Sequence, residues 1–259
     1  MNLHALTEAL YLAAAVLATF GLAVRKPQLS RAAVGALAAG AVVHAAAFLQ
    51  IHQFKIPPKL TGLPGAVSLA AWLGTLFFLA LVRRPRFDAL VVIVAPAAFL
   101  GAFFGSMAQG VVVHHGAPLW AQAHVLLASA GIALLGVAGA AGLLFLAQHR
   151  SLKRKAQPPG RSGLPPLEAL DRVNALAVSV GFLLLSLALV TGVLWTLESE
   201  GRPWPRSPHA NAALLAWAIY AVLVASRWLA RQGAMRSAQT AVAGFAVLLA
   251  AVVGVGMMQ

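Results

Sequence analysis

Eight long apolar stretches, joined by loops whose basic residues alternate from loop to loop, limit most strongly what this chain can fold into. Of the 19 Lys and Arg residues, 15 fall in the first, third, fifth and seventh loops. Lys and Arg are retained on the cytoplasmic side of a membrane. The pattern therefore predicts eight spans, with the odd-numbered loops cytoplasmic and with both the N-terminus and the C-terminus outside.

The composition agrees with a chain that lies mostly in lipid. It is 61% hydrophobic and 10% charged, whereas soluble domains are about 45–50% apolar and about 25% charged. Lipid cannot satisfy open backbone groups, so runs of this length favour helices. We therefore expect an all-α polytopic membrane protein, a bundle of eight transmembrane helices in a single membrane domain over residues 1–259. The predicted spans lie near residues 3–24, 32–51, 64–82, 89–107, 119–147, 173–197, 210–229 and 237–257.

Charge and cysteine content exclude several classes of function. The net charge of +13 resembles that of nucleic-acid-binding proteins, but most of it lies in the predicted cytoplasmic loops, so we expect the lipid bilayer and no nucleic acid as partner. The chain has no cysteine, which excludes disulfides, thiolate metal sites and thioether attachment of haem. No Asp, Glu, Lys or Arg lies near the middle of a predicted span, which argues against an ion-coupled transporter. The first ten residues lack Lys and Arg, so we expect the first span to remain in the mature protein.

Two histidines enter the predicted spans from the outer side. At 1.5 Å per residue, His44 lies about 10 Å and His124 about 7 Å from the outer ends of their helices. Small residues flank both, which permits either close helix contact or room for a flat ligand. Neutral imidazole is a good axial ligand for haem iron, so our hypothesis is that the two side chains hold one haem. The alternative is that each imidazole only forms a hydrogen bond with a neighbouring helix.

The outer loop that follows the sixth predicted span adds four candidate haem contacts. Trp195 and Trp204 suit the headgroup region and would line the outer lip of the site. Arg202 or Arg206 could pair with the anionic haem propionates, for which guanidinium is well suited. An equally good alternative is that both arginines face water.

From the fifth predicted span onward, the sequence resembles the cytochrome c assembly family, the CcsA, CcmC and CcmF group of haem-handling membrane proteins. Within that group it is similar to the eight-span HemX-like and YpjD-like branch. The matching segments, in order, are Ala123-His124-Val125, the basic inner loop, residues 164–171, Gly181-Phe182, Thr191-Gly192, Trp195, residues 215–220, Arg227 and Gly244-Phe245. The resemblance implies a protein of the bacterial inner membrane with haem b as cofactor, and with other assembly subunits or apocytochrome as partners.

The sequence departs from the family pattern at landmarks of the haem ligases. Their outer loop ends in Trp-Asp-Pro, where this chain has Arg206, Ser207 and Pro208, and Ala225 stands where they carry a histidine. They carry a further histidine beyond the last span, where this sequence ends at Gln259. We therefore expect a non-enzymatic haem carrier or assembly subunit. Two alternatives are a HemX-like regulator of tetrapyrrole synthesis that contacts a cytosolic enzyme, and a scaffold or transporter subunit without haem.

The charge pattern makes a direct prediction about topology. A reporter fused after Arg161 should be cytoplasmic and one fused after Gln259 should be outside, because basic loops stay inside. Paired alkaline phosphatase and green fluorescent protein fusions at each position measure sidedness. The same sidedness at both positions would contradict the predicted arrangement.

Overall fold

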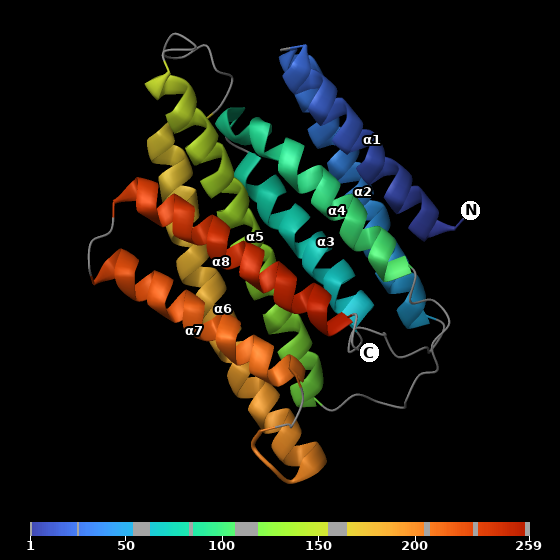
Figure 1. The fold of residues 1–259 in the computed structure, drawn as a ribbon. Coiled ribbons are helices and arrows are strands. Elements are labelled where there is room, and N and C mark those ends of the chain that lie inside the picture. Colours follow the sequence, from blue (N-terminus) through green and yellow to red (C-terminus); the bar gives the residue numbers. More distant parts are fainter. Residues whose placement is uncertain are drawn as a thin grey trace. The chain divides into compact units, whose positions relative to one another are not determined.

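The protein is helical throughout the part that its structure, a computed structural model, describes (Figure 1). The described residues are 2–24, 26–53, 63–82, 85–106, 119–154, 165–204, 208–229 and 233–256. Within these ranges there is no β-strand, so the all-α prediction is confirmed. The elements are α1 (Leu3–Ala23), α2 (Pro27–Gln53), α3 (Leu63–Val82), the 3-10 helix η2 (Pro85–Leu90), α4 (Val91–Ser106), α5 (Leu119–Lys153), α6 (Leu167–Glu200), α7 (Pro208–Trp228) and α8 (Ala234–Gly256).

Helix length and composition make this a multi-pass membrane protein. Seven helical segments of the described chain are long and apolar enough to cross a bilayer, and they correspond to the first seven predicted spans. In α8 the apolar segment found within the described residues is shorter, Ala234–Ala250. The eighth span and the outside location of the termini therefore stay predictions.

The surface of α6 shows that its surroundings are apolar. Its exposed side chains include Leu176, Leu183, Val190 and Leu197, which repeat every seven residues and so form one stripe along the helix. The opposite face, with Val178, is buried in the protein. A helix that is apolar on both faces is stable in lipid and not in water. The exposed stripe of α6 is therefore a lipid-facing surface.

Two helices extend well beyond the spans expected from hydropathy. The predicted fifth span ends near residue 147 and the sixth begins near residue 173, whereas α5 continues to Lys153 and α6 begins at Leu167. With 35 and 34 residues, each helix is about 50 Å long, against about 30 Å of hydrocarbon. The apolar segment of each helix ends where polar residues begin, but the helical backbone hydrogen bonds continue through those polar residues.

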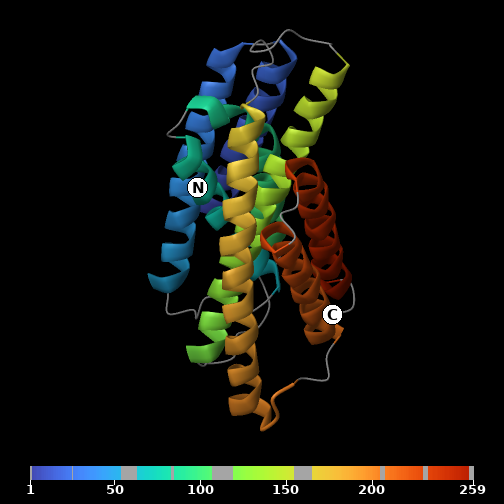
Figure 2. The ribbon, with the colours of Figure 1, turned by 90° about the vertical axis from the view of Figure 1, so that its left-hand side faces the viewer.

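The described helices divide into two compact units. In the first unit, α1 packs against α2 and α4, and α3 packs against α4 and α2. In the second unit, α5 and α6 form a long antiparallel pair, α8 packs along α5, and α7 packs against α8 and α6 (Figures 1 and 2). Each unit therefore has its own helix packing, and the single membrane domain expected from the sequence stays a prediction.

Polar contacts connect the helices of the second unit. Asn174 of α6 is 2% exposed; its amide donates to the carbonyl of Ala138 on α5 (2.9 Å), and its oxygen accepts from Ser237 on α8 (3.3 Å). The guanidinium of Arg227 on α7 contacts the carboxylate of Asp171 on α6 at 2.8 Å. These contacts hold three helices around α6, which provides most of the candidate site.

Candidate functional site

His44 lies in the core of the first unit with both ring nitrogens engaged. Its side chain is 1% exposed. Nδ1 lies 3.2 Å from the hydroxyl of Tyr11 on α1, and Nε2 lies 2.9 Å from the hydroxyl of Ser68 on α3. The imidazole also stacks on Phe48, with ring centroids 4.7 Å apart. His44 thus joins three helices, and neither nitrogen is available to iron unless one of these hydrogen bonds is given up.

The small residues that flank the two histidines serve close helix contact. At Gly40 an added Cβ would lie 2.6 Å from the ring of Tyr11. At Gly131 it would lie 3.2 Å from the carbonyl oxygen of Gly181 on α6. Protein atoms therefore fill the space at both positions. Of the two roles that the sequence permitted for these residues, the structure supports contact between helices.

His124 lies at the junction of α5 and α6 in the second unit, and its arrangement differs from that of His44. Its Nδ1 lies 2.7 Å from the carbonyl oxygen of Ala188 on α6. A carbonyl oxygen only accepts, so Nδ1 carries the proton and donates it. In the neutral ring Nε2 then has the lone pair, and no hydrogen bond to Nε2 occurs among the residues that the structure describes. Metal-binding histidines are oriented in this way by a carbonyl on the second nitrogen.

Trp195 is the aromatic neighbour of His124. It lies two turns of α6 beyond Ala188, and its ring centroid is 6.0 Å from that of the imidazole, with the planes tilted by 43°. Because His124 comes from α5 and Trp195 from α6, the packing of these two helices brings them together. The sequence predicted both residues as haem contacts, and the structure places them side by side.

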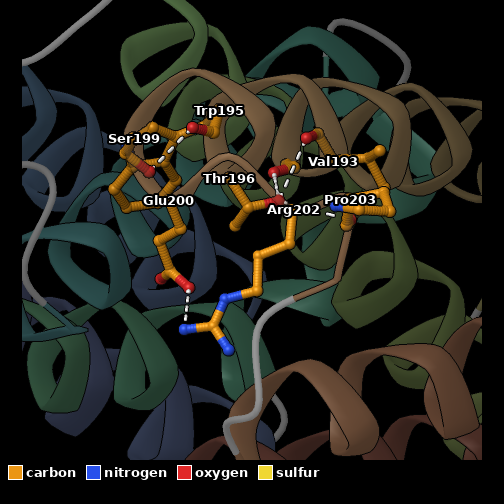
Figure 3. Close-up of polar contacts among 8 residues, drawn as sticks. Val193, Trp195, Thr196, Ser199, Glu200, Arg202 and Pro203 are labelled. Carbon is orange, nitrogen blue, oxygen red and sulfur yellow. Dashed lines mark hydrogen bonds and ion pairs between the residues drawn. The ribbon is translucent and has the colours of Figure 1, made fainter.

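The segment after α6 turns back toward the end of that helix (Figure 3). Gly201 makes the turn with a positive φ of 68°, and its N–H donates to the carbonyl of Leu197 (3.1 Å). The hydroxyl of Thr196 then lies 3.3 Å from the carbonyl of Pro203. Such a left-handed residue is a common end to a helix, and glycine adopts it without steric cost. The turn directs the following residues, including Trp204, toward the start of α7.

The other predicted contacts of this loop have different surroundings. The indole N–H of Trp204 donates to the side-chain oxygen of Asn211 on α7 (3.3 Å). Arg202 forms an ion pair with Glu200 at 3.2 Å, in which both side chains are largely exposed (Figure 3). An exposed pair of this kind contributes little to stability. Arg206 lies outside the described residues.

The structure brings together some of the predicted site residues. His124 and Trp195 are neighbours in the second unit, which also contains Arg202 and Trp204, whereas His44 belongs to the first unit. The pairing of the two histidines on one haem therefore stays a prediction. Within the described chain, no group of three or more His, Cys, Asp or Glu side chains is arranged to hold a metal ion. A haem, which needs one or two axial ligands, is compatible with that result.

Sequence reasoning missed the partners that give each histidine its role. Tyr11 and Ser68 hold His44, and the carbonyl of Ala188 beside Gly192 receives His124. A glycine inside an apolar helix signals a close approach of another group, so Gly192 carried a usable signal. The role of the Ala188 backbone carbonyl cannot be recognised from the sequence, since every residue has a backbone carbonyl.

Similarity to known proteins assigns the family. The model of the family described as Cytochrome C assembly protein matches residues 60–259. The chain belongs to this family. The resemblance drawn from the second half of the sequence is thereby confirmed, while the HemX-like and YpjD-like branch stays a prediction.

Individual relatives agree with this assignment. The cytochrome c biogenesis protein CcsA of Prochlorococcus marinus strain MIT 9303 is 26% identical over an alignment of 231 residues, and the match covers 77% of this chain and 73% of that protein. CcsA of Synechococcus sp. strain CC9605 is 27% identical over 228 residues, covering 77% of this chain and 75% of the relative. CcsA of Mesostigma viride is 21% identical over 234 residues, covering 80% of this chain and 75% of the relative.

A solved structure shares the fold. The cytochrome c heme lyase CcmF aligns with 99% of this chain at a TM-score of 0.69 and 15% sequence identity. The alignment covers 49% of CcmF, so this chain spans about half the length of that protein. At this level of identity, the likeness concerns the fold alone.

The contacts of the two histidines predict different costs on removal. His44→Ala removes two hydrogen bonds in the protein interior, to the hydroxyls of Tyr11 and Ser68, at about 1–3 kcal/mol each, so we expect a loss of about 2–5 kcal/mol in the free energy of unfolding. His124→Ala removes one hydrogen bond from a partly buried side chain, for about 1 kcal/mol. Unfolding of haem-free protein by sodium dodecyl sulfate in mixed micelles measures both losses.

Tyr11→Phe is the matched control for the His44 variant. It removes one hydroxyl and keeps the ring that packs against Gly40, so it should cost less than His44→Ala. Equal losses for His44→Ala and His124→Ala would contradict the different roles that the contacts assign to the two residues.

Proposed function

We propose that this protein binds haem b within a bacterial cytoplasmic membrane and acts in the biogenesis of c-type cytochromes. Family membership supports this proposal, since relatives over three quarters of the chain are named as cytochrome c biogenesis proteins. The name of the solved structure that shares the fold, a heme lyase, also associates this fold with haem. The lipid-facing surfaces of the helices support a role inside the membrane.

The orientation of His124 is the observation that carries the proposal. Its Nδ1–H is held by the carbonyl of Ala188, which leaves Nε2 as the nitrogen with a lone pair. Haem supplies an iron that accepts such a nitrogen as an axial ligand. The residues present therefore fit this group: one imidazole with a defined tautomer, and the indole of Trp195 beside it as an apolar surface for a porphyrin edge.

His44 would be the second residue to hold haem iron, as the sequence predicts. To bind iron, it would exchange the hydrogen bond between its Nε2 and Ser68 for a bond to the metal, while the bond between Nδ1 and Tyr11 keeps the ring oriented. This exchange costs one buried hydrogen bond. We therefore propose His124 as the principal ligand and His44 as the weaker one.

Residues of the loop after α6 would hold the polar edge of haem. Arg202 is bound to Glu200 in an exposed pair, which a propionate carboxylate could replace with a similar contact. Arg206 and Trp204 are further candidates, on the basis of their proximity to Arg202 in the sequence. The indole N–H of Trp204 is already engaged by Asn211, so its ring face would serve as an apolar wall.

We propose that the protein is an assembly subunit or haem carrier, not a ligase on its own. Covalent attachment requires that haem and apocytochrome be held in a defined geometry by several contacts. Arg206, Ser207 and Ala225 replace a tryptophan, an aspartate and a histidine of the ligase pattern. Haem bound by this chain would then be passed to other assembly subunits or to apocytochrome.

The proposal predicts that haem binding depends on His124. His124→Ala should lose the absorption bands of imidazole-ligated haem, because the nitrogen donor is removed. The measurement is a haem titration of the purified, detergent-solubilised protein, followed by absorbance. The control is His149→Ala, since His149 stacks on Phe145 at the other end of α5. Unchanged bands in His124→Ala would disprove the assigned role.

The proposed carrier role predicts no ligation by this protein alone. When it is expressed with an apocytochrome in a host that lacks an assembly system, no covalent holocytochrome should form, because the tryptophan, aspartate and histidine of the ligase pattern are replaced in this chain. Haem staining of denaturing gels measures the product, and a complete assembly system in the same host is the positive control. A haem-stained apocytochrome band with this chain alone would establish it as an enzyme.

A further inference from the structure

Gly192 stands opposite the imidazole of His124, at a position in α6 that no larger residue could occupy without displacing the ring. A Cβ added at Gly192 would lie 2.9 Å from Nδ1 and 3.1 Å from Cε1 of His124. Glycine is among the least favourable residues in a helix interior. Its presence here gives the imidazole direct access to the backbone of α6.

The acceptor for His124 lies one turn earlier on the same face of α6. Ala188 and Gly192 are four residues apart, so they are neighbours along the helix. The carbonyl of Ala188 receives Nδ1–H at 2.7 Å, while the absence of a side chain at Gly192 leaves room for the ring beside it. Ala188 itself is 2% exposed, so water does not compete strongly for this carbonyl. The bond crosses between α5 and α6, 64 residues apart in the sequence.

We propose that Gly192 and the Ala188 carbonyl form a socket on α6 that holds His124 in the Nδ1-protonated tautomer, so that Nε2 is presented to haem iron. As a statement about haem, the inference rests on the proposed function. Gly192 and Ala188 are positioning residues, since they act through His124. The tautomer follows from the chemistry of the socket: a carbonyl accepts a proton and cannot donate one.

If the socket exists, a larger side chain at position 192 must act by displacing His124 and not by a general loss of packing between α5 and α6. Gly181 is a matched control for this distinction. It lies eleven residues earlier, which is about three turns, so it also faces α5. An added Cβ there would lie 3.0 Å from the side chain of Leu135 and 3.2 Å from the carbonyl of Gly131, and the three atoms nearest to it belong to these two residues. Gly181→Ala therefore disturbs the contact between α5 and α6 to a similar degree without touching the socket.

The first experiment measures the tautomer in haem-free protein. The full chain, labelled with ¹⁵N at histidine, is examined by nuclear magnetic resonance in detergent micelles, and the His124 signals are assigned with His124→Ala. We expect a protonated Nδ1 in the wild type and in Gly181→Ala, and loss of this tautomer in Gly192→Ala. The signals of His149, in the same unit, report whether each variant is folded. An unchanged His124 tautomer in folded Gly192→Ala overturns the inference, whatever the protein does with haem.

The second experiment measures haem affinity in the same variants. Loss of a group that orients a metal-binding histidine lowers metal affinity by about 10-fold to 100-fold, so we expect a loss of that size in Gly192→Ala and a smaller one in Gly181→Ala. In the His124→Ala background, Gly192→Ala should have no further effect. If Gly192→Ala loses the tautomer but keeps its haem affinity, the proposed role of the socket in haem binding is overturned. Haem affinity that is independent of His124 overturns the proposed function, while the tautomer experiment still reports on the socket itself.

Discussion

Lipid offers no hydrogen bonds, and this constraint acts on the polar groups that the chain carries into the membrane. Many hydroxyl side chains satisfy it locally, as when Thr19 donates to the carbonyl of Ala15 on its own helix. Others join helices: the indole N–H groups of Trp217 and Trp228 on α7 donate to Ser186 and Ser179 on α6. Helices that cannot rely on the hydrophobic effect for their association are thus held by close packing and by these polar contacts.

The same constraint gives two histidines in similar sequence surroundings different chemistry. His44 meets hydroxyl groups on both sides, and a hydroxyl can donate or accept, so the ring is fully engaged whichever tautomer it adopts. His124 meets a carbonyl on one side, which selects a single tautomer and leaves the second nitrogen available. Whether a histidine in these helices is structural or a candidate ligand therefore depends on which hydrogen-bonding groups the neighbouring helices offer it. The depth in the membrane that the sequence predicts is similar for both residues and does not distinguish them.

Particular residues show how far the candidate site could be predicted. His124 and Trp195 were identified because a histidine inside one apolar helix and a tryptophan near the end of another are unusual enough to notice, and the structure brings them together. Gly192 was noticed as part of a family motif, but its purpose became clear only with the imidazole against it. The pairing of Trp204 with Asn211 and of Arg202 with Glu200 depends on a turn at Gly201, whose geometry the composition of the loop did not specify.

Long apolar runs and short motifs are properties of local segments, so the residue order was enough to predict the helical class, the first seven of the eight predicted spans and the family. It also identified which histidines enter the membrane. The folded structure was needed to see what those histidines contact, how far α5 and α6 extend beyond their apolar segments, and that small residues bring helices together. Contacts of this kind arise between segments that are distant in the chain, such as α5 and α6. A hydrogen bond between residues 64 positions apart depends on how the two helices pack, and not on the order of residues in either helix.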